Sequence, residues 1–331
     1  MQAGYSVLPI AITPEAGMVR YPGSAESLRA DALPVVTGGD AEVSIPIDPT
    51  VRGVVIDGRV EHVDVVFPVL HGPWGEDGTI QGLLELAGLP YVGSGVLASA
   101  LCMDKITLKT VLRAAEIPVA PWVAVDADSW STDRAEVVEA IVAIGPEVFV
   151  KPSRAGSSVG IRKVRVDPLD LSLLETAIEN ARKHDPRVIV EAAVSGAREI
   201  ECGVRQLASG ERQASRCAEI VVHPDFEFYD FEAKYLSDGA DLVVPADLEP
   251  GLADEVRNLA LRCFAEAGCE GLARVDFFVG EEGIVVNEVN TMPGFTSISM
   301  YPRMWQATSV NYVDLVDSLV AEALARSPGL R

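Results

Sequence analysis

The segment from Leu272 to Gly294 places acidic and amide side chains at a spacing that suits a metal ion. It predicts two apolar strands joined by a Gly/Glu turn. Glu288 and Asn290 are two residues apart, so they share a face of the second strand. If Asp276 on the first strand faces the same side, three hard oxygen ligands converge. Such oxygens without Cys or His favour Mg²⁺, which leaves positions open for phosphate. The pattern predicts chemistry on a nucleotide, and a solvated acidic hairpin is the alternative.

The register of this hairpin decides between the two interpretations. Directly opposed residues share a face, so Asp276 and Glu288 do so only if the paired residue numbers sum to an even value. A tight turn that pairs Gly280 with Gly283 gives an odd sum. The metal site therefore requires a β-bulge or an odd-length turn.

A second candidate site is a loop of small residues that follows a strand ending near Lys151. Backbone N–H groups of residues 154–160 could cradle a phosphate, and the lysine would supply the countercharge. Ser157 and Ser158 add hydroxyl donors. The loop matches neither the P-loop nor the Gly-x-Gly-x-x-Gly signature. An ordinary turn between two strands is the alternative.

Two carboxylates farther along the chain could bind the rest of a nucleotide. Glu191 ends an apolar strand and could accept a hydrogen bond from an adenine amino group, and Glu199 could hold ribose hydroxyls. Surface carboxylates in an acidic chain are the alternative. Arg274 shares the face of Asp276, where it could hold an oxyanion or a substrate carboxylate, or form a salt bridge to Asp276 or Glu288.

Two further segments carry isolated candidates. Lys234 could bridge a terminal phosphate and Tyr235 could donate to a substrate group. Both lie in residues 224–241, which lack periodicity and predict a functional loop. His71 opens a glycine-rich loop after an apolar run. Its side chain could contact a ligand, and a purely structural role is the alternative.

Short apolar runs alternate with helical segments and predict an α/β fold with open sheets, whose ligands lie at the C-terminal ends of strands. The predicted strands are 4–13, 63–70, 91–95, 118–125, 148–152, 161–166 and 188–191, and the predicted helices are 79–87, 103–115, 134–144 and 171–183. Within this list, 118–125 is predicted to be an edge strand because it contains proline.

Composition narrows the class of protein. The chain of 331 residues has 27 Lys and Arg against 49 Asp and Glu, a net charge of −22, which disfavours nucleic acid and anionic membrane as partners. Such a chain must concentrate positive charge locally if it binds ATP. Five scattered cysteines, no long apolar stretch and no signal peptide predict a cytoplasmic protein with reduced thiols.

The chain resembles the D-alanine–D-alanine ligases of the ATP-grasp family. The resemblance covers nearly the whole chain, and its motifs occur in the family's order. They are residues 71–82, Met103-Asp-Lys105, residues 151–160, Glu232-Ala-Lys-Tyr235, Arg274-Val-Asp276, and residues 287–294 through Ser299 and Met300.

This resemblance implies three α/β domains, at 1–93, 94–190 and 191–331, with a lid at about 224–241 and ATP between the second and third. The N-terminal domain would be Rossmann-like. ATP would phosphorylate the carboxylate of one D-alanine, and the amine of a second would attack the acyl phosphate. The product would serve peptidoglycan synthesis. The family also suggests a homodimer.

Residue roles follow from the resemblance by position. Lys105, Lys151, Ser158 and Lys234 would contact phosphates, and Glu191, Val194 and Glu199 would surround adenosine. Asp276, Glu288 and Asn290 would bind two Mg²⁺ or Mn²⁺. Arg274 and the Gly294 N–H would stabilise the oxyanion, while His71, Ser299 and Met300 would line the substrate site. Ser157 and Tyr235 would link to close the lid, and a neutral Tyr235 would favour an amine nucleophile over D-lactate.

One departure from the family pattern adds alternatives. The family's first strand–loop–helix unit, with a glutamate that anchors the first D-alanine, has no counterpart in this sequence. We therefore expect an incomplete N-terminal domain. A catalytically impaired nucleotide-binding protein, and a ligase with another second substrate, remain alternatives to D-alanyl-D-alanine synthesis.

Overall fold

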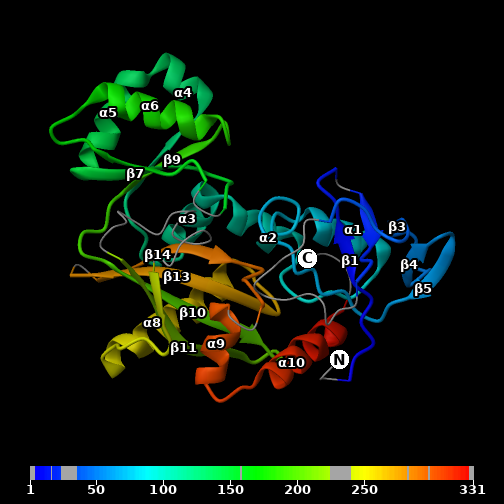
Figure 1. Cartoon of the computed structure of the whole chain (residues 1–331). Coiled ribbons are helices and arrows are strands. Elements are labelled where there is room, and N and C mark those ends of the chain that lie inside the picture. The colour runs from blue at the N-terminus through cyan, green and yellow to red at the C-terminus, as the bar shows by residue number, and fades with distance from the viewer. Residues whose placement is uncertain are drawn as a thin grey trace.

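The computed structural model describes residues 4–15, 17–23, 36–156, 159–223, 240–281, 283–296 and 299–327. Three regions stand out (Figure 1): a lobe with β7, β9 and α4 to α6, a larger sheet with α8 and α9, and an N-terminal region beside it with α1 and β3 to β5. Strand order in the four described sheets is β1-β2, β3-β4-β5, β6-β9-β7-β8 and β12-β11-β10-β13-β14.

The five-stranded sheet is antiparallel, and α8 covers one of its faces, while α9 packs on the β10–β11 part of the other. Its strands are β10 (Arg198–Gln206), β11 (Arg212–Val222), β12 (Ala240–Val243), β13 (Leu272–Gly280) and β14 (Gly283–Asn290). Alternate β13 residues Val275, Phe277 and Val279 pack against α8 (Pro250–Glu266), whose Phe264 is fully buried. The period of two leaves Arg274 and Asp276 on the opposite face.

The four-stranded sheet is built the same way. Its strands are β6 (Trp122–Val125), β7 (Glu147–Pro152), β8 (Arg162–Arg165) and β9 (Val188–Ala192). Its helices are α4 (Ala127–Thr132), α5 (Arg134–Ala143) and α6 (Leu171–Arg182). Val148, Val150 and Val190 pack under the helices, so Phe149 and Lys151 face the other way. The face of this sheet opposite its helices and the face of the five-stranded sheet opposite α8 are turned toward each other (Figure 1).

Helices α2 (Val96–Met103) and α3 (Lys105–Ala114) lie at the junction of the sheets. Leu108 and Leu112 of α3 belong to the core beneath the five-stranded sheet. Residues 96–114, predicted to belong to the middle domain, thus bury their apolar face against the C-terminal sheet, which offers the matching apolar surface. The three-domain division itself stays a prediction.

The N-terminal region contains short strands and one helix. They are β1 (Ile10–Ile12), β2 (Met18–Arg20), β3 (Val43–Ser44), β4 (Gly53–Ile56), β5 (Arg59–His62) and α1 (Thr79–Ala87). The predicted strand 4–13 is thus confined to 10–12. The predicted strand 63–70 is wrong: it makes one parallel bridge, from Val66 to Tyr91. Pro68 lacks an N–H, and the N–H groups of Val69 and Leu70 bond two residues back, so no ladder continues.

The predicted helices 79–87, 103–115 and 171–183 are present with shifts of up to two residues at their ends, and local capping accounts for where they begin and end. Asp104 and Asp170 cap α3 and α6 by accepting from the N–H groups of Thr107 and Leu173, and Gly88 ends α1 at φ 64°. Strand β6 lies at a sheet edge. The chain closes with α9 (Met300–Ala307) and α10 (Tyr312–Ala325). Among the described residues no helix has the length and apolarity to cross a membrane.

Candidate functional site

The β13–β14 hairpin brings the predicted metal ligands together. Gly280 pairs with Gly283, yet Asp276 pairs with Glu288, because the register shifts between Asp276 and Phe277. The bulge that the sequence requires is therefore present, and Asn287 is the extra residue. Asn290 donates to Asp276 Oδ2 at 3.0 Å. Two carboxylates and an amide oxygen thus share the polar face of the sheet.

Arg274 lies on the same face and is held by two carboxylates. Its Nε and Nη2 donate to the two oxygens of Asp276, each at 2.7 Å. Its Nε is also 3.3 Å from Oε1 of Glu201, on the neighbouring strand β10. Burial lowers the pKa of Arg274, but Asp276 and Glu201 raise it well above its ordinary value. The guanidinium is a fixed cation in this site.

Lys105 connects the hairpin to the predicted phosphate loop. Its Nζ lies 3.6 Å from Glu288 Oε2 and donates to the carbonyl of Ala155 at 2.9 Å. Arg154, at the start of the loop, pairs with Asp185 through side chain and backbone N–H. The pairing with Asp185 ties the start of the loop to the segment that precedes β9. Lys105 binds the carbonyl of the next loop residue, Ala155.

Lys151 and Glu191 face the hairpin from the four-stranded sheet. Lys151 Nζ lies 2.7 Å from Glu191 Oε2 and donates to Asn287 Oδ1 at 3.4 Å. Lys109 of α3 takes the other oxygen, Oε1, at 2.7 Å. Burial raises the pKa of Glu191, but the two ammonium groups outweigh it and lower that pKa to about 2. Glu191 is therefore ionised and engaged by two lysines.

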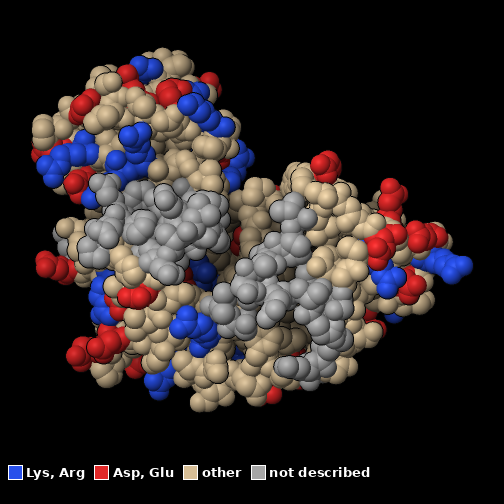
Figure 2. Space-filling view, in the orientation of Figure 1, with Lys and Arg blue, Asp and Glu red and all other residues tan. Residues whose placement is uncertain are grey.

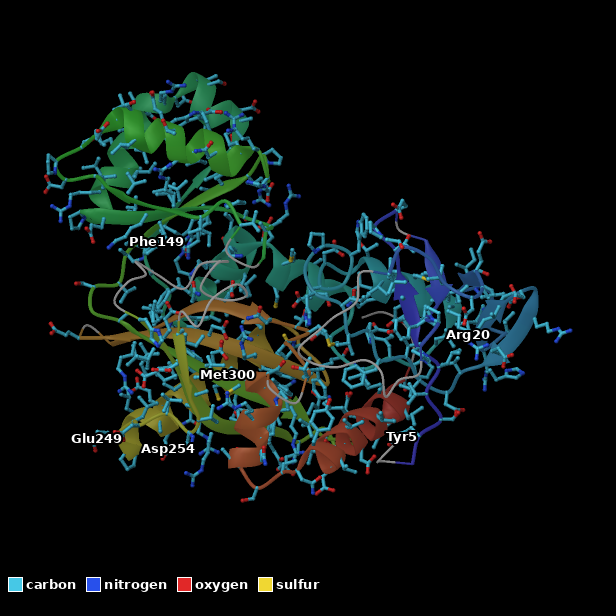
Figure 3. All side chains as sticks on the ribbon, in the orientation of Figure 1. Tyr5, Arg20, Phe149, Glu249, Asp254 and Met300 are labelled. Carbon is cyan, nitrogen blue, oxygen red and sulfur yellow. The ribbon has the colours of Figure 1, made fainter. Side chains whose placement is uncertain are left out.

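The remaining candidates for adenosine contacts surround this cluster. Phe149 pairs with Glu191 across β7 and β9, and its ring lies 5.6 Å from Lys151 Nζ. Figure 3 shows Phe149 on the side of the upper lobe that faces the larger sheet. Glu199 and Val194 are half-buried, and Val194 lies against Gly280 of the hairpin turn. Glu199 shares the polar face of β10 with Glu201.

His71 and its glycine-rich loop attach to the end of the hairpin. His71 Nδ1 lies 3.0 Å from the carbonyl oxygen of Met292. Glu76 of the same loop accepts from the Gly72 N–H at 2.7 Å and from the Met292 N–H at 3.4 Å. Burial raises the pKa of Glu76. The loop is thus tied to the segment that carries Gly294.

The predicted substrate segment follows. Ser299 Oγ accepts from the Thr296 N–H at 3.1 Å, and a Cβ on Gly294 would lie 2.9 Å from that oxygen. Ser299 opens α9. Met300, at the end of α9 nearest β13 in Figure 3, is 7% exposed and packs with Ile220 and Met304. The Met300 side chain is therefore part of the apolar core beside β11, and its predicted role at the substrate carboxylate stays a prediction.

Four predicted residues fall outside the described part of the chain: Ser157, Ser158, Lys234 and Tyr235. Sequence reasoning in turn missed four residues that line the site, which are Glu76, Lys109, Phe149 and Glu201. Lys109 was detectable, because it lies one helical turn from Lys105 on α3. Glu201 was detectable by its alternation with Glu199.

The residues of the hairpin fit a magnesium ion. Among the described residues no cluster of three His, Cys, Asp or Glu side chains forms a metal site. Mg²⁺ does not need one, since it commonly takes one or two carboxylates and completes its shell with phosphate and water. Asp276, Glu288 and Asn290 supply that donor set, and Lys105 and Lys151 adjoin it.

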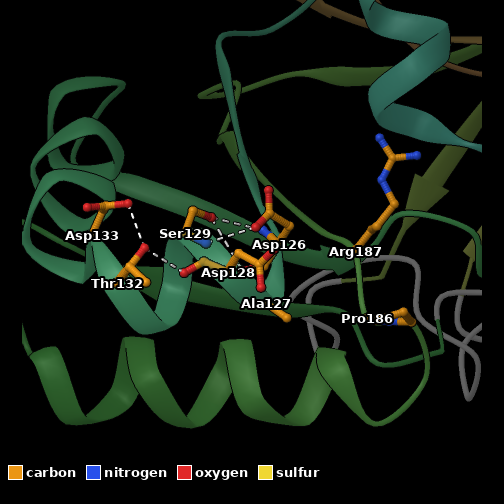
Figure 4. A pocket seen from close by; sticks show the side chains of 8 residues that line it. All are labelled: Asp126, Ala127, Asp128, Ser129, Thr132, Asp133, Pro186 and Arg187. Atoms are coloured by element: carbon orange, nitrogen blue, oxygen red, sulfur yellow. Dashed lines mark hydrogen bonds between the residues drawn. The ribbon is translucent and has the colours of Figure 1, made fainter.

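A separate concave surface lies at the start of α4, where Pro186 and Arg187 also line it (Figure 4). Several of its polar groups bond one another or a nearby side chain: Asp126 accepts from the Ser129 N–H, Thr132 donates to the Asp128 carbonyl, and Arg187 pairs with Asp104. Figure 2 shows Lys and Arg side chains over the lobe that contains α4, whereas acidic side chains gather on the N-terminal region. This surface surrounds the N-terminal cap of α4, and none of its lining residues belongs to the β13–β14 hairpin.

Comparisons with known proteins place this geometry in context. The sequence matches the family described as D-ala D-ala ligase N-terminus over residues 1–94 and D-ala D-ala ligase C-terminus over residues 111–321. The D-alanine–D-alanine ligases of Nocardia farcinica and Mycolicibacterium vanbaalenii are each 50% identical, over 99% of this chain and 90% of theirs.

Solved structures agree with the sequence comparison. The VanG D-Ala:D-Ser ligase from Enterococcus faecalis superimposes with a TM-score of 0.82 at 34% identity, over 96% of this chain and 90% of that one. D-alanyl-alanine synthetase A from Vibrio cholerae gives a TM-score of 0.80 at 31% identity, over 97% and 88%. The predicted α/β fold class, ATP-grasp, is confirmed.

Proposed function

We propose, from the premise that the chain belongs to the D-ala D-ala ligase family, that it joins two D-alanines to D-alanyl-D-alanine at the expense of ATP. The product would serve peptidoglycan synthesis. The observation that carries the proposal is the pairing of Asp276 with Glu288 on a sheet face opposite Lys151. A cluster of this kind combines oxygen ligands for a divalent ion with cations for a phosphate chain.

ATP would lie between the two facing sheets. Phe149 and Val194 offer apolar surface for the base, and Glu199 offers acceptors for ribose hydroxyls. Lys105 and Lys151 would hold phosphate oxygens, while Asp276, Glu288 and Asn290 would hold two magnesium ions. When bound, those ions would neutralise phosphate charge. Positive charge is thereby concentrated in a chain of net charge −22.

The chain's own groups then account for the later steps. Phosphoryl transfer needs positioning and charge neutralisation more than covalent help. The buried Arg274 would stabilise the oxyanion that forms when an amine attacks the acyl phosphate, and the Gly294 N–H would do the same from the other side. The loop held by Glu76 would keep His71 beside the substrate. Residues 224–241 remain our predicted lid, which would exclude water from the acyl phosphate.

Phosphate release tests the proposal directly. Purified chain with ATP and Mg²⁺ should release phosphate only when D-alanine is added, and mass spectrometry should find D-alanyl-D-alanine. Nucleotide binding with no phosphate release in the presence of D-alanine would instead support the catalytically impaired alternative, and release that does not depend on D-alanine would contradict the proposed ligation. A homodimer remains a prediction that light scattering would check.

The identity of the second substrate is a further point to test. A D-Ala:D-Ser ligase is among the similar structures, at 34% identity. D-serine and D-lactate should therefore be offered in competition with D-alanine. We expect the D-alanine dipeptide to dominate, and a majority of another product would move the chain to the D-alanine–D-X alternative.

A further inference from the structure

Lys109 is the most deeply buried cation that the described part of the structure places at this site, and the proposed mechanism does not use it. Its side chain lies on α3, one helical turn after Lys105, and is 1% exposed. Its Nζ is 2.7 Å from Glu191 Oε1 and donates to the Val286 carbonyl at 3.2 Å. Val286 immediately precedes the extra residue of the hairpin. One ammonium therefore contacts both facing sheets.

The charges of Glu191, Lys109 and Lys151 do not cancel. Glu191 carries one negative charge, and its two oxygens are each shared with one lysine, Lys109 at one side and Lys151 at the other. The three groups together carry one net positive charge. A carboxylate paired with Lys151 alone would cancel the ammonium. Burial lowers the pKa of Lys109, and Glu191 opposes that effect.

We propose that Lys109 is a positioning residue for the nucleotide site: by sharing Glu191, it leaves Lys151 with net positive charge for the phosphates of ATP. The inference rests on the proposed function, since it assigns how that site keeps its charge. Lys109 itself, lying behind Glu191, contacts no phosphate. Its bond to the Val286 carbonyl also holds the bulge at Asn287, which Lys151 touches.

The test compares affinities for nucleotides with different numbers of phosphates. Binding of adenosine, AMP, ADP and ATP would be measured by calorimetry without D-alanine, on wild type and on Lys109→Met, Lys109→Arg and Lys183→Met. Lys183 is an exposed lysine at the end of α6, bonded only locally to Asn180. Lys109→Met should weaken ATP binding by about tenfold or more. This is a lower bound on the effect of removing one positive charge a few ångströms from Lys151 at an intermediate dielectric constant.

The phosphate dependence separates an electrostatic role from a structural one. We expect the loss to shrink from ATP through ADP and AMP to adenosine, Lys109→Arg to retain most of the affinity, and Lys183→Met to match wild type. An equal loss for adenosine and ATP, or no loss at all, would overturn the inference. If wild type itself fails to bind ATP, the proposed function fails instead.

A double variant guards against misfolding of the single one. Lys109→Met with Glu191→Gln removes one positive and one negative charge together, so Lys151 regains an uncancelled charge. The ratio of ATP to adenosine affinity should then return to within a few-fold of wild type, whatever Glu191 contributes to adenine binding. A ratio that stays as low as in Lys109→Met would contradict the charge-sharing role.

Discussion

Asp276 lies directly opposite Glu288 because Asn287 is an extra residue in β14. If the register set by Gly280 and Gly283 continued unchanged, Asn287 would oppose Asp276. Glu288 would then point into the apolar core that holds Val275 and Val289. A single bulge therefore determines whether the hairpin presents two carboxylates or one.

Removing the charge of Glu288 tests this relationship. Glu288→Gln keeps the shape but supplies a weaker ligand, so we expect D-alanine-dependent phosphate release to fall by about a hundredfold or more, a loss typical of removing one strong electrostatic contact at a reacting centre. The measurement is a Mg²⁺ titration at saturating ATP, in which the variant should need more metal. Glu281→Gln, in the turn of the same hairpin, is the control. Equal metal dependence in both variants would refute the ligand role.

Arg274 should not be replaceable by lysine. Its guanidinium donates to both oxygens of Asp276 while lying 3.3 Å from Glu201, a geometry that one ammonium group cannot reproduce. Arg274→Lys should lower kcat by about a hundredfold to a thousandfold, the range seen when one oxyanion donor is lost. The KM for ATP should change little. Steady-state kinetics would check this, and a variant with unchanged kcat would show that Arg274 serves only as a counter-ion.

Much of the site was predictable because it follows short-range rules. Alternation along each strand placed Arg274 with Asp276, and Glu288 with Asn290. Gly280 and Gly283 give an odd sum of paired residue numbers and Asp276 and Glu288 an even one, so a common face required a bulge. The helical spacing could have placed Lys109 beside Lys105, but the contacts of Lys109 and Glu76 could not be predicted, because their partners lie far away in sequence. Lys109 contacts Glu191 and Val286, and Glu76 contacts Met292.

In the fold, too, features set by neighbouring residues were predictable, and features set by residues far away in sequence were not. Helices α3 and α6 have polar caps that mark their first residues, so their starts were predictable. Residues 63–70 carry the apolar run of a buried strand, but strand formation depends on partners, and Pro68 and Pro90 limit the pairing to one bridge. The packing of α2 against β14 and of α3 against α8, rather than against the middle sheet, depends on tertiary contacts and has no local signal in the sequence.

Gly294 should tolerate no side chain. A Cβ at this position would lie 2.9 Å from Ser299 Oγ and 3.3 Å from Ser299 Cβ, closer than ordinary contacts. Gly294→Ala should displace Ser299 from Thr296 and raise the KM for D-alanine several-fold, because misplaced binding groups lose orientation. Gly251→Ala, where a Cβ meets no neighbour within 4 Å, is the matched control. If both glycine variants have wild-type KM, neither Gly294 nor Ser299 lies at the substrate.

Glu191 should make the stability of the protein depend on acid. Its pKa is about 2 in the folded protein against 4.5 ordinarily, so its contribution to the free energy of unfolding is complete above pH 4.5. That contribution is lost as the pH falls toward 2, and the shift corresponds to about 3 kcal/mol. Glu191→Gln should be destabilised near pH 7 by that order of magnitude, since it leaves Lys109 and Lys151 without their carboxylate.

The difference between wild type and Glu191→Gln should then shrink as the pH is lowered from 4.5 toward 2, because protonated Glu191 and glutamine are both neutral. Urea unfolding at a series of pH values measures it. Glu175→Gln, which removes an exposed partner of Arg134, should differ from wild type by less than about 1 kcal/mol throughout. A difference for Glu191→Gln that is constant with pH would mean that shape, and not charge, sets the contribution of Glu191.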